Sequence, residues 1–277
     1  MKEPEGALYE MFKFCFGGDL FDEVLEVLTI NPSEGEYASL WTNVEGIYEN
    51  VMVPLAVGLV FIYFLVFLLH RFTDERMTWE QVFMLFVKLV AAKFIIDNGF
   101  DILSQLWGFG ISVIADLAEY KGYAFSLEEL KGPWESLTGV KWPESPGLIK
   151  DWGIVAWIQM LIPMAISWVL KIAINVICYA RLLELLVRTA MAPLAFADFF
   201  TEGLHGAGWK FLKSYFAVCL QGFVIAVIAI LFAILGQTIE MGNGFFMFAL
   251  KYAIIGFAAL ACVAKSQNIV KEIVNVH

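Results

Sequence analysis

Two long runs of uncharged, mostly apolar residues constrain this chain more than any other feature. The first covers residues 51–69, VMVPLAVGLVFIYFLVFLL, and the second covers residues 214–239. A helix needs about 20 such residues to cross the hydrocarbon core of a bilayer, which is about 30 Å thick. Soluble proteins do not bury two stretches of this kind, and 60% of all residues are hydrophobic. We therefore expect an all-α, polytopic membrane protein whose function is carried out in or across a bilayer.

The spacing of apolar runs and breaks predicts a membrane helix bundle over residues 50–264, with about five transmembrane helices plus amphipathic helices. The apolar stretch 79–117 would reach about 60 Å as one helix, so we expect a break near Asp97–Asn98–Gly99 or near Gly108–Phe109–Gly110. Residues 79–100 are compatible either with crossing the membrane or with lying along it. The third span is followed by a stretch that continues its helical pattern toward Val187. The spans are expected at about 50–70, 82–117, 152–180, 212–237 and 244–264.

The charge distribution predicts the orientation of the bundle. Residues 1–49 are acidic, which argues against a grip on nucleic acid or attraction to anionic lipid there. Between Leu20 and Leu28 apolar residues recur near helical spacing, so we expect an amphipathic helix on the membrane surface or on a partner subunit. The stretches 71–76, 181–213 and 265–277 together carry eight lysines and arginines, whereas residues 1–49 and the loop 119–150 carry six, spread through longer and more acidic sequence. By the positive-inside rule, residues 1–49 and the loop lie outside the membrane, and the segment 181–211 and the tail 265–277 are cytoplasmic.

The sequence carries no recognisable catalytic motif. It lacks a phosphate-binding loop, a dinucleotide fingerprint, a nucleophile elbow and a zinc-protease motif. The cysteines form no CxxC pair and the histidines are scattered, so no zinc constellation is expected. We therefore expect no enzyme activity, no cofactor and no metal site. The residues in question are Cys15, Cys178, Cys219, Cys262, His70, His205 and His277.

A polar stripe lies within the second predicted span. Lys93, Asp97, Asp101 and Ser104 follow at steps of four, four and three, which places them on one face of a helix. Ionisable groups inside a membrane are costly and face protein or water. The stripe faces water on a half-inserted helix, lines a pore or a seam between subunits, or relays protons.

The stripe also supports a different function, that of a secondary transporter or ion channel in which Lys93, Asp97 and Asp101 bind or relay ions. Against this stand the odd number of spans and the absence of a detectable inverted repeat. A membrane anchor for a partner protein is a third interpretation.

A second group of charges follows the third predicted span. Arg181, Glu184 and Arg188 share a helix face at steps of three and four. They form either an ion-paired cytoplasmic extension of the span or a docking surface for a cytoplasmic partner. Lone lysines near the span ends are expected to extend to the lipid head groups: Lys88, Lys171 and Lys251.

The stretch RLLELLVRTAMAPLAFAD (181–198) leads through a glycine-rich turn to WKFLKSYFAVCLQG (209–222). This order of motifs resembles the polytopic TrbL-type inner-membrane subunit of type IV secretion and conjugation systems, in the short form found on mobile elements of Gram-positive bacteria. The resemblance is clearest over residues 150–265, and the first 150 residues share only the general plan.

The resemblance implies a channel or scaffold component of the bacterial plasma membrane that assembles as homo-oligomeric rings. It implies work beside other secretion subunits, including ATPases, and contact with membrane lipids. It also implies contact with a DNA–protein substrate in transit, without stable sequence-specific binding of nucleic acid. It supplies no catalytic residues. The matching residues would lie at the cytoplasmic mouth or contact partner subunits: Arg181, Glu184, Arg188, Pro193 and Asp198.

Overall fold

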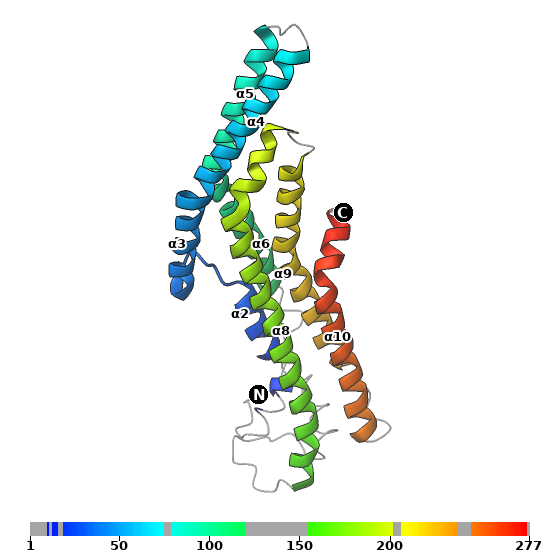
Figure 1. The fold of residues 1–277 in the computed structure, drawn as a ribbon. Coiled ribbons are helices and arrows are strands. Elements are labelled where there is room, and N and C mark those ends of the chain that lie inside the picture. The colour runs from blue at the N-terminus through cyan, green and yellow to red at the C-terminus, as the bar shows by residue number, and fades with distance from the viewer. Residues whose placement is uncertain are drawn as a thin grey trace. The chain divides into compact units, whose positions relative to one another are not determined.

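The computed structural model (Figure 1) describes residues 10, 13–15, 19–74, 79–119, 154–201, 206–237 and 245–275. Every regular element in these ranges is a helix, which confirms the all-α class. The helices and helical turns, in chain order, are α2 (Asp19–Leu28), η1 (Gly35–Tyr37), α3 (Ala38–Ile47), η2 (Tyr48–Met52), α4 (Val53–Asp74), α5 (Trp79–Asp97), α6 (Gly99–Glu119), α8 (Ile154–Phe196), η3 (Ala197–Phe200), α9 (Ala207–Gln237) and α10 (Phe245–Ile273).

Five helical stretches among the described residues are long and apolar enough to cross a membrane, which confirms a polytopic membrane protein. Their backbone hydrogen bonds are made within each helix, as the hydrocarbon core requires. Helix α5 is not one of them, because four charged side chains interrupt its apolar sequence. The five stretches are Ala38–His70, Gly99–Leu117, Leu161–Phe200, Ala207–Phe232 and Ala249–Ile273.

The helices extend beyond several of the predicted spans. Helix α8 continues to Phe196, past the predicted end of the third span at residue 180, and α10 continues to Ile273. The continuation of the helical pattern toward Val187 was predicted, and the helix extends nine residues further, to Phe196. The loop predicted over residues 119–150 lies, apart from Glu119, outside the described residues.

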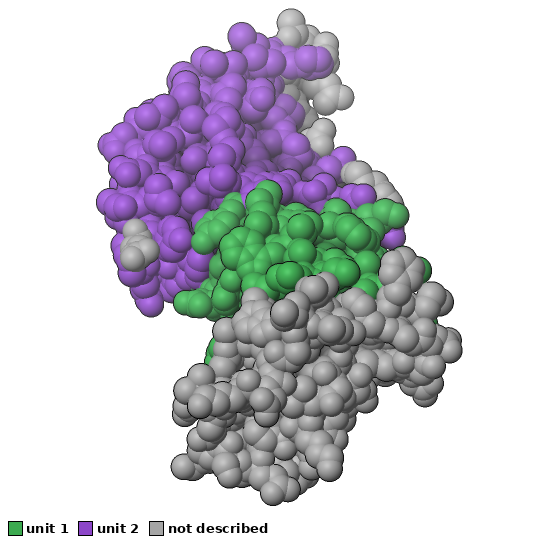
Figure 2. All heavy atoms as spheres, turned by 90° about the horizontal axis from the view of Figure 1, so that it is seen from below, with its two compact units in different colours: residues 1–29, 112–179, 222–266 green, residues 30–111, 180–221, 267–277 purple. Residues whose placement is uncertain are grey.

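The chain divides into two compact units, each built from three separate segments (Figure 2). Unit 1 contains residues 1–29, 112–179 and 222–266, and unit 2 contains residues 30–111, 180–221 and 267–277. Each unit has a hydrophobic cluster of its own. All the candidate site residues belong to unit 2.

In unit 1 the predicted amphipathic helix is present as α2, and its apolar face is buried in the protein. Val24, Leu25 and Leu28 join a cluster that includes Leu170 and Ile174 of α8. The Glu23 carboxylate forms an ion pair with the Lys171 ammonium group, which also lies 5.3 Å from the centre of the Phe14 ring. Helix α2 therefore packs on the same chain through both apolar and charged contacts.

A second polar contact in unit 1 joins the N-terminal segment to α8 and α10. The Ser167 and Tyr252 hydroxyl groups lie 2.8 Å apart, and the Tyr252 hydroxyl donates to the Cys15 carbonyl oxygen at 3.1 Å. Burial raises the pKa of the Cys15 thiol to about 11, and a hydrogen bond with Ser167 partly opposes this rise. The thiol is therefore protonated at neutral pH, as expected of a structural cysteine.

In unit 2, α4 and α5 form an antiparallel hairpin (Figure 1). The turn η3 packs against both legs of this hairpin, and the Phe64 ring of α4 lies 6.2 Å from the Phe200 ring of η3. Below the hairpin, α3 packs on α6 through Trp41, whose ring lies 5.0 Å from that of Phe100 and 5.4 Å from that of Trp107. The cluster of unit 2 thus centres on aromatic side chains.

The structure places the predicted break in the second apolar stretch at Asn98. Helix α5 ends at Asp97 and α6 begins at Gly99, while the Asn98 amide side chain donates to the Phe94 carbonyl oxygen at 2.8 Å. Asparagine side chains compete with the regular helical hydrogen bonds in this way. No second break occurs at Gly108–Phe109–Gly110, which lies inside α6.

Candidate functional site

Arg181 is buried between α8 and α9 in unit 2, where only 7% of its surface is exposed. Its Nε–H group donates to the Val218 carbonyl oxygen at 3.0 Å, and an Nη–H group donates to the Cys219 carbonyl oxygen at 3.0 Å. A guanidinium group carries several N–H donors in a fixed plane, which suits it to reach two adjacent carbonyl groups of a neighbouring helix. Arg181 therefore joins two membrane-length helices directly.

One turn further along α8, a charged network links three helices. The Arg188 guanidinium donates to Glu184 Oε1 at 2.6 Å within α8 and to the Ser214 hydroxyl of α9 at 2.7 Å. The Gln267 amide of α10 donates to the same Glu184 oxygen at 3.0 Å. The side chains of Arg188 and Glu184 are only 23% and 32% exposed. Hydrogen bonds between helices replace lost hydration in such partly buried sites.

A neutral hydrogen-bonded group lies beside this network and adds a fourth helix. The Thr189 and Tyr215 hydroxyl groups are 3.0 Å apart, and the Tyr215 hydroxyl also lies 3.4 Å from the Leu103 carbonyl oxygen of α6. Thr189 and Tyr215 are fully buried. Together with the Arg181 and Glu184–Arg188 contacts, this group connects α6, α8, α9 and α10 by polar side chains in one region of unit 2.

Pro193 and Asp198 lie where α8 turns toward α9. Pro193 is buried within the last turns of α8. Asp198 accepts hydrogen bonds from the Thr201 hydroxyl and from the backbone N–H of Ala207, both at 2.6 Å. Ala207 is the first residue of α9, so the carboxylate satisfies one of its free amide groups and lies at the positive end of the helix. Asp198 thus stabilises the α8–α9 turn.

The predicted stripe of Lys93, Asp97, Asp101 and Ser104 is divided by the break at Asn98, so it does not follow one continuous helix. Lys93 Nζ lies 3.3 Å from Asp97 Oδ2, with side chains 64% and 44% exposed. Asp101 is also exposed, in the first turn of α6, and Ser104 is half-buried. The stripe therefore lies on the surface of unit 2, separate from the network around Arg188.

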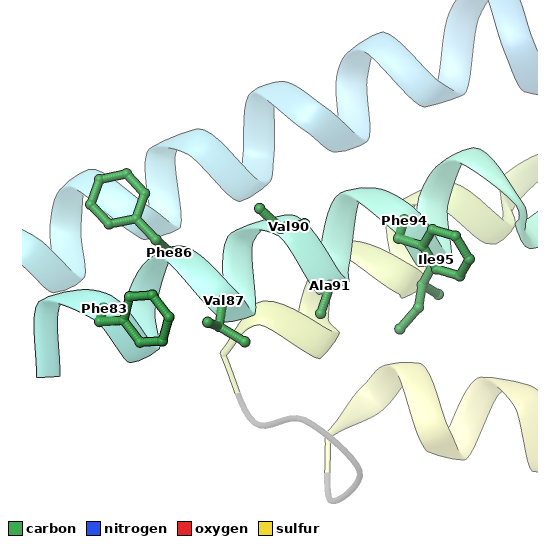
Figure 3. Close-up of a pocket in the computed structure, with 7 residues that line it drawn as sticks. All are labelled: Phe83, Phe86, Val87, Val90, Ala91, Phe94 and Ile95. Atoms are coloured by element: carbon green, nitrogen blue, oxygen red, sulfur yellow. The ribbon is translucent and has the colours of Figure 1, made fainter. Parts of the chain in front are cut away.

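An apolar groove runs along the outer face of α5. Figure 3 shows that all the labelled side chains come from this helix, with Phe86 directed toward α4. The Phe86 ring lies 5.5 Å from that of Phe64. No polar side chain lines the groove, which is formed by Phe83, Phe86, Val87, Val90, Ala91, Phe94 and Ile95.

Within the described ranges, no group of three or more histidine, cysteine, aspartate or glutamate side chains could hold a metal ion. The chemistry of the region around Arg188 is that of hydrogen bonds and ion pairs between helices. These contacts stabilise a helix arrangement, and they place no nucleophile beside a general base.

Sequence reasoning missed several members of the network. Thr189, Ser214, Tyr215 and Gln267 contact the predicted residues only because α6, α8, α9 and α10 pack together. The available signal was a polar residue inside an apolar run, as at Thr189 and Tyr215. Polar side chains in membrane helices normally face other helices.

The fold and these contacts define a class: an all-α, multi-pass membrane protein whose polar residues join helices to one another. Within this class, the chain belongs to the TrbL/VirB6 plasmid conjugal transfer-like family, whose model matches residues 22–193, more than half of the chain. The protein is thus a membrane component of conjugal transfer, of the type IV secretion kind, that works with other subunits of such a system.

The family match includes much of the N-terminal half, where the sequence resemblance was only general, and it ends at Pro193 within the quoted motif. No curated protein and no solved structure matches the chain.

Proposed function

We propose that the protein is an oligomeric channel or scaffold subunit in a bacterial plasma membrane and helps to form the path for a DNA–protein substrate. The observation that carries this proposal is the network that joins α8, α9 and α10 through Arg188, Glu184 and Gln267. Family membership gives the system in which such a scaffold acts. Force for transfer would come from partner ATPases.

The large apolar surface of the chain supports assembly in the membrane. On α4, exposed apolar side chains occur on more than one side of the helix, and α5 adds an apolar groove. Surfaces of this kind contact lipid or other membrane helices. We assign the surface around Lys93 and Asp97 to the interface between neighbouring copies of the chain. At the edge of this interface, the Lys93–Asp97 ion pair remains hydrated.

We place the α8–α9 turn at the cytoplasmic end, with the N-terminus outside and the C-terminus in the cytoplasm. Lys210 and Lys213 follow this turn, consistent with the positive-inside rule. In this orientation Arg181, Glu184, Arg188, Pro193 and Asp198 shape the inner mouth of the membrane domain.

Native mass spectrometry of the protein in lipid nanodiscs tests the oligomeric part of the proposal. We expect one defined copy number above two, as in a closed ring. A monomer at all protein concentrations would contradict the proposal.

Transfer assays test the role of the mouth. With expression and membrane insertion unchanged, Arg188→Ala should lower the frequency of conjugal transfer at least tenfold, whereas the exposed control Lys210→Ala should not. Unchanged transfer with Arg188→Ala would remove this residue from the mechanism. The rival function, ion transport through Lys93, Asp97 and Asp101, would instead show an ion flux in liposomes that is lost with Asp97→Asn.

A further inference from the structure

Both legs of the α4–α5 hairpin are interrupted where they join the rest of unit 2. Before α4, residues Tyr48–Met52 form a π-helical turn, and after α5 the helix breaks at Asn98. Single π-turns and breaks are the usual places at which long helices bend.

The two interruptions are in direct contact. The Tyr48 hydroxyl donates to the Ile96 carbonyl oxygen at 2.7 Å, and both residues are almost completely buried. Ile96 lies in the last turn of α5, where carbonyl groups lose their partners within the helix. The Tyr48 ring also packs at 5.4 Å against the Phe100 ring of α6. One side chain thus connects the base of α4 to both sides of the break.

The end of α8 is a third interruption, and it contacts the first two at Gly99. A Cβ atom on Gly99 would lie 2.4 Å from the Tyr48 hydroxyl oxygen and 2.4 Å from Phe196 Cε2. Phe196 is the last residue of α8 before the chain tightens into the 3₁₀ turn η3. Glycine is the residue that allows such a close approach of backbone and side chains.

The hairpin extends past the α8–α9 turn (Figure 1). Phe64 of α4 packs on Phe200 of η3, so residues 65–74 continue beyond the turn by about 15 Å at 1.5 Å per residue. Leu65, Val66 and Leu69 in this part are exposed. The apolar parts of α4, α8 and α9 must share one hydrocarbon layer about 30 Å thick. A change in the tilt of the hairpin would bring them into the same layer.

We propose that Tyr48, Asn98–Gly99 and Phe196 form a hinge on which the α4–α5 hairpin moves relative to the α8–α9 turn. The Tyr48–Ile96 hydrogen bond and the packing of η3 on both legs of the hairpin hold the position seen in this structure. Hinges are commonly a few residues at the ends of helices that absorb the change in backbone angles. This inference is independent of the transfer function, because it concerns motion within unit 2.

Pulsed electron paramagnetic resonance tests the hinge on the full chain in nanodiscs of phosphatidylethanolamine and phosphatidylglycerol. The exposed Cys262 is replaced by serine, and labels are placed at Met84→Cys on α5 and Lys210→Cys on α9. An excess of unlabelled Cys262→Ser chain suppresses distances between copies. The matched control pair, Leu183→Cys with Lys210→Cys, reports on α8 and α9, which the hinge does not separate.

The hairpin pair should give a broader distance distribution than the control pair. The Tyr48→Phe variant lacks only the hydroxyl group. In this variant, the ratio of molecules at the original distance between the two labels to molecules at other distances should fall about fivefold, equivalent to about 1 kcal/mol. Gly99→Ala should shift the same distribution through its added Cβ, with the control pair unchanged. A hairpin distribution as narrow as the control, or one that neither variant changes, would overturn the hinge.

Discussion

Single polar side chains in unit 2 join helices through hydrogen bonds, and the stabilisation from each bond depends on how well its partner is placed. Asp198 illustrates this at the start of α9, where its carboxylate accepts a hydrogen bond from the Ala207 backbone N–H group. From the sequence, Asp198 was singled out only through the family resemblance of the 181–198 stretch, and nothing separated it from the charged residues of α8. The structure gives it a specific role as a helix cap.

Asp198→Ala should destabilise the protein by about 1 kcal/mol, because it removes the side-chain acceptor at the start of α9. Asp198→Asn retains an acceptor and should lose much less. Thermal unfolding in detergent micelles, followed by circular dichroism, measures both variants. If Asp198→Ala unfolded at the same temperature as the unaltered protein, the cap would contribute nothing.

Arg181→Ala should cost about 2–3 kcal/mol, because two hydrogen bonds from a charged donor to α9 are lost in a buried site. The same unfolding measurement applies, with the exposed Lys210→Ala as the control. If the two variants unfolded at the same temperature, the Arg181 contacts would have no structural importance.

At the scale of helices, local sequence signals predicted the helices and their breaks well. Contacts between residues far apart in the chain were not predicted. The helical spacing of apolar residues predicted α2, and the sequence offered two candidate breaks, of which the structure shows the one at Asp97–Asn98–Gly99. Lys171, in contrast, was expected to extend to the head groups, but it pairs with Glu23. No local pattern connects two residues so far apart in the chain, so only the packing of α2 on α8 shows the pair.

The pairing of α2 with α8 makes a prediction about charge. Glu23→Lys places two ammonium groups together and should increase hydrogen exchange at the amides of residues 24–28. The charge-swapped double variant, Glu23→Lys with Lys171→Glu, restores opposite charges. It should recover most of the protection of these amides against hydrogen exchange. If the double variant exchanged as fast as the single one, the ion pair would not hold α2 in place.

The link between α8 and α10 can be measured by a double-mutant cycle. Glu184→Ala and Gln267→Ala each remove one side of the same hydrogen bond, so their effects on the free energy of unfolding should not add. We expect a coupling of about 0.5–1.5 kcal/mol. The pair Glu184→Ala with Lys210→Ala serves as an uncoupled control, and additivity in both cycles would contradict the link.

For the whole molecule, composition already determined the class, because two uncharged runs and 60% hydrophobic residues require a bilayer. The five membrane-length helices among the described residues also match the predicted number, since hydropathy is a local property of each segment. The division into two units was not, because each unit combines three distant segments of the chain. The same reason explains why Ser214 and Gln267 were absent from the predicted site.

The central claim, that this membrane protein is a working component of conjugal transfer, is tested most directly by mating frequency. A donor strain with an in-frame deletion of the gene is compared with the same strain carrying the gene in trans. We predict that transfer falls by at least a hundredfold in the deletion strain and returns with the restored gene. Undiminished transfer from the deletion strain would contradict the account.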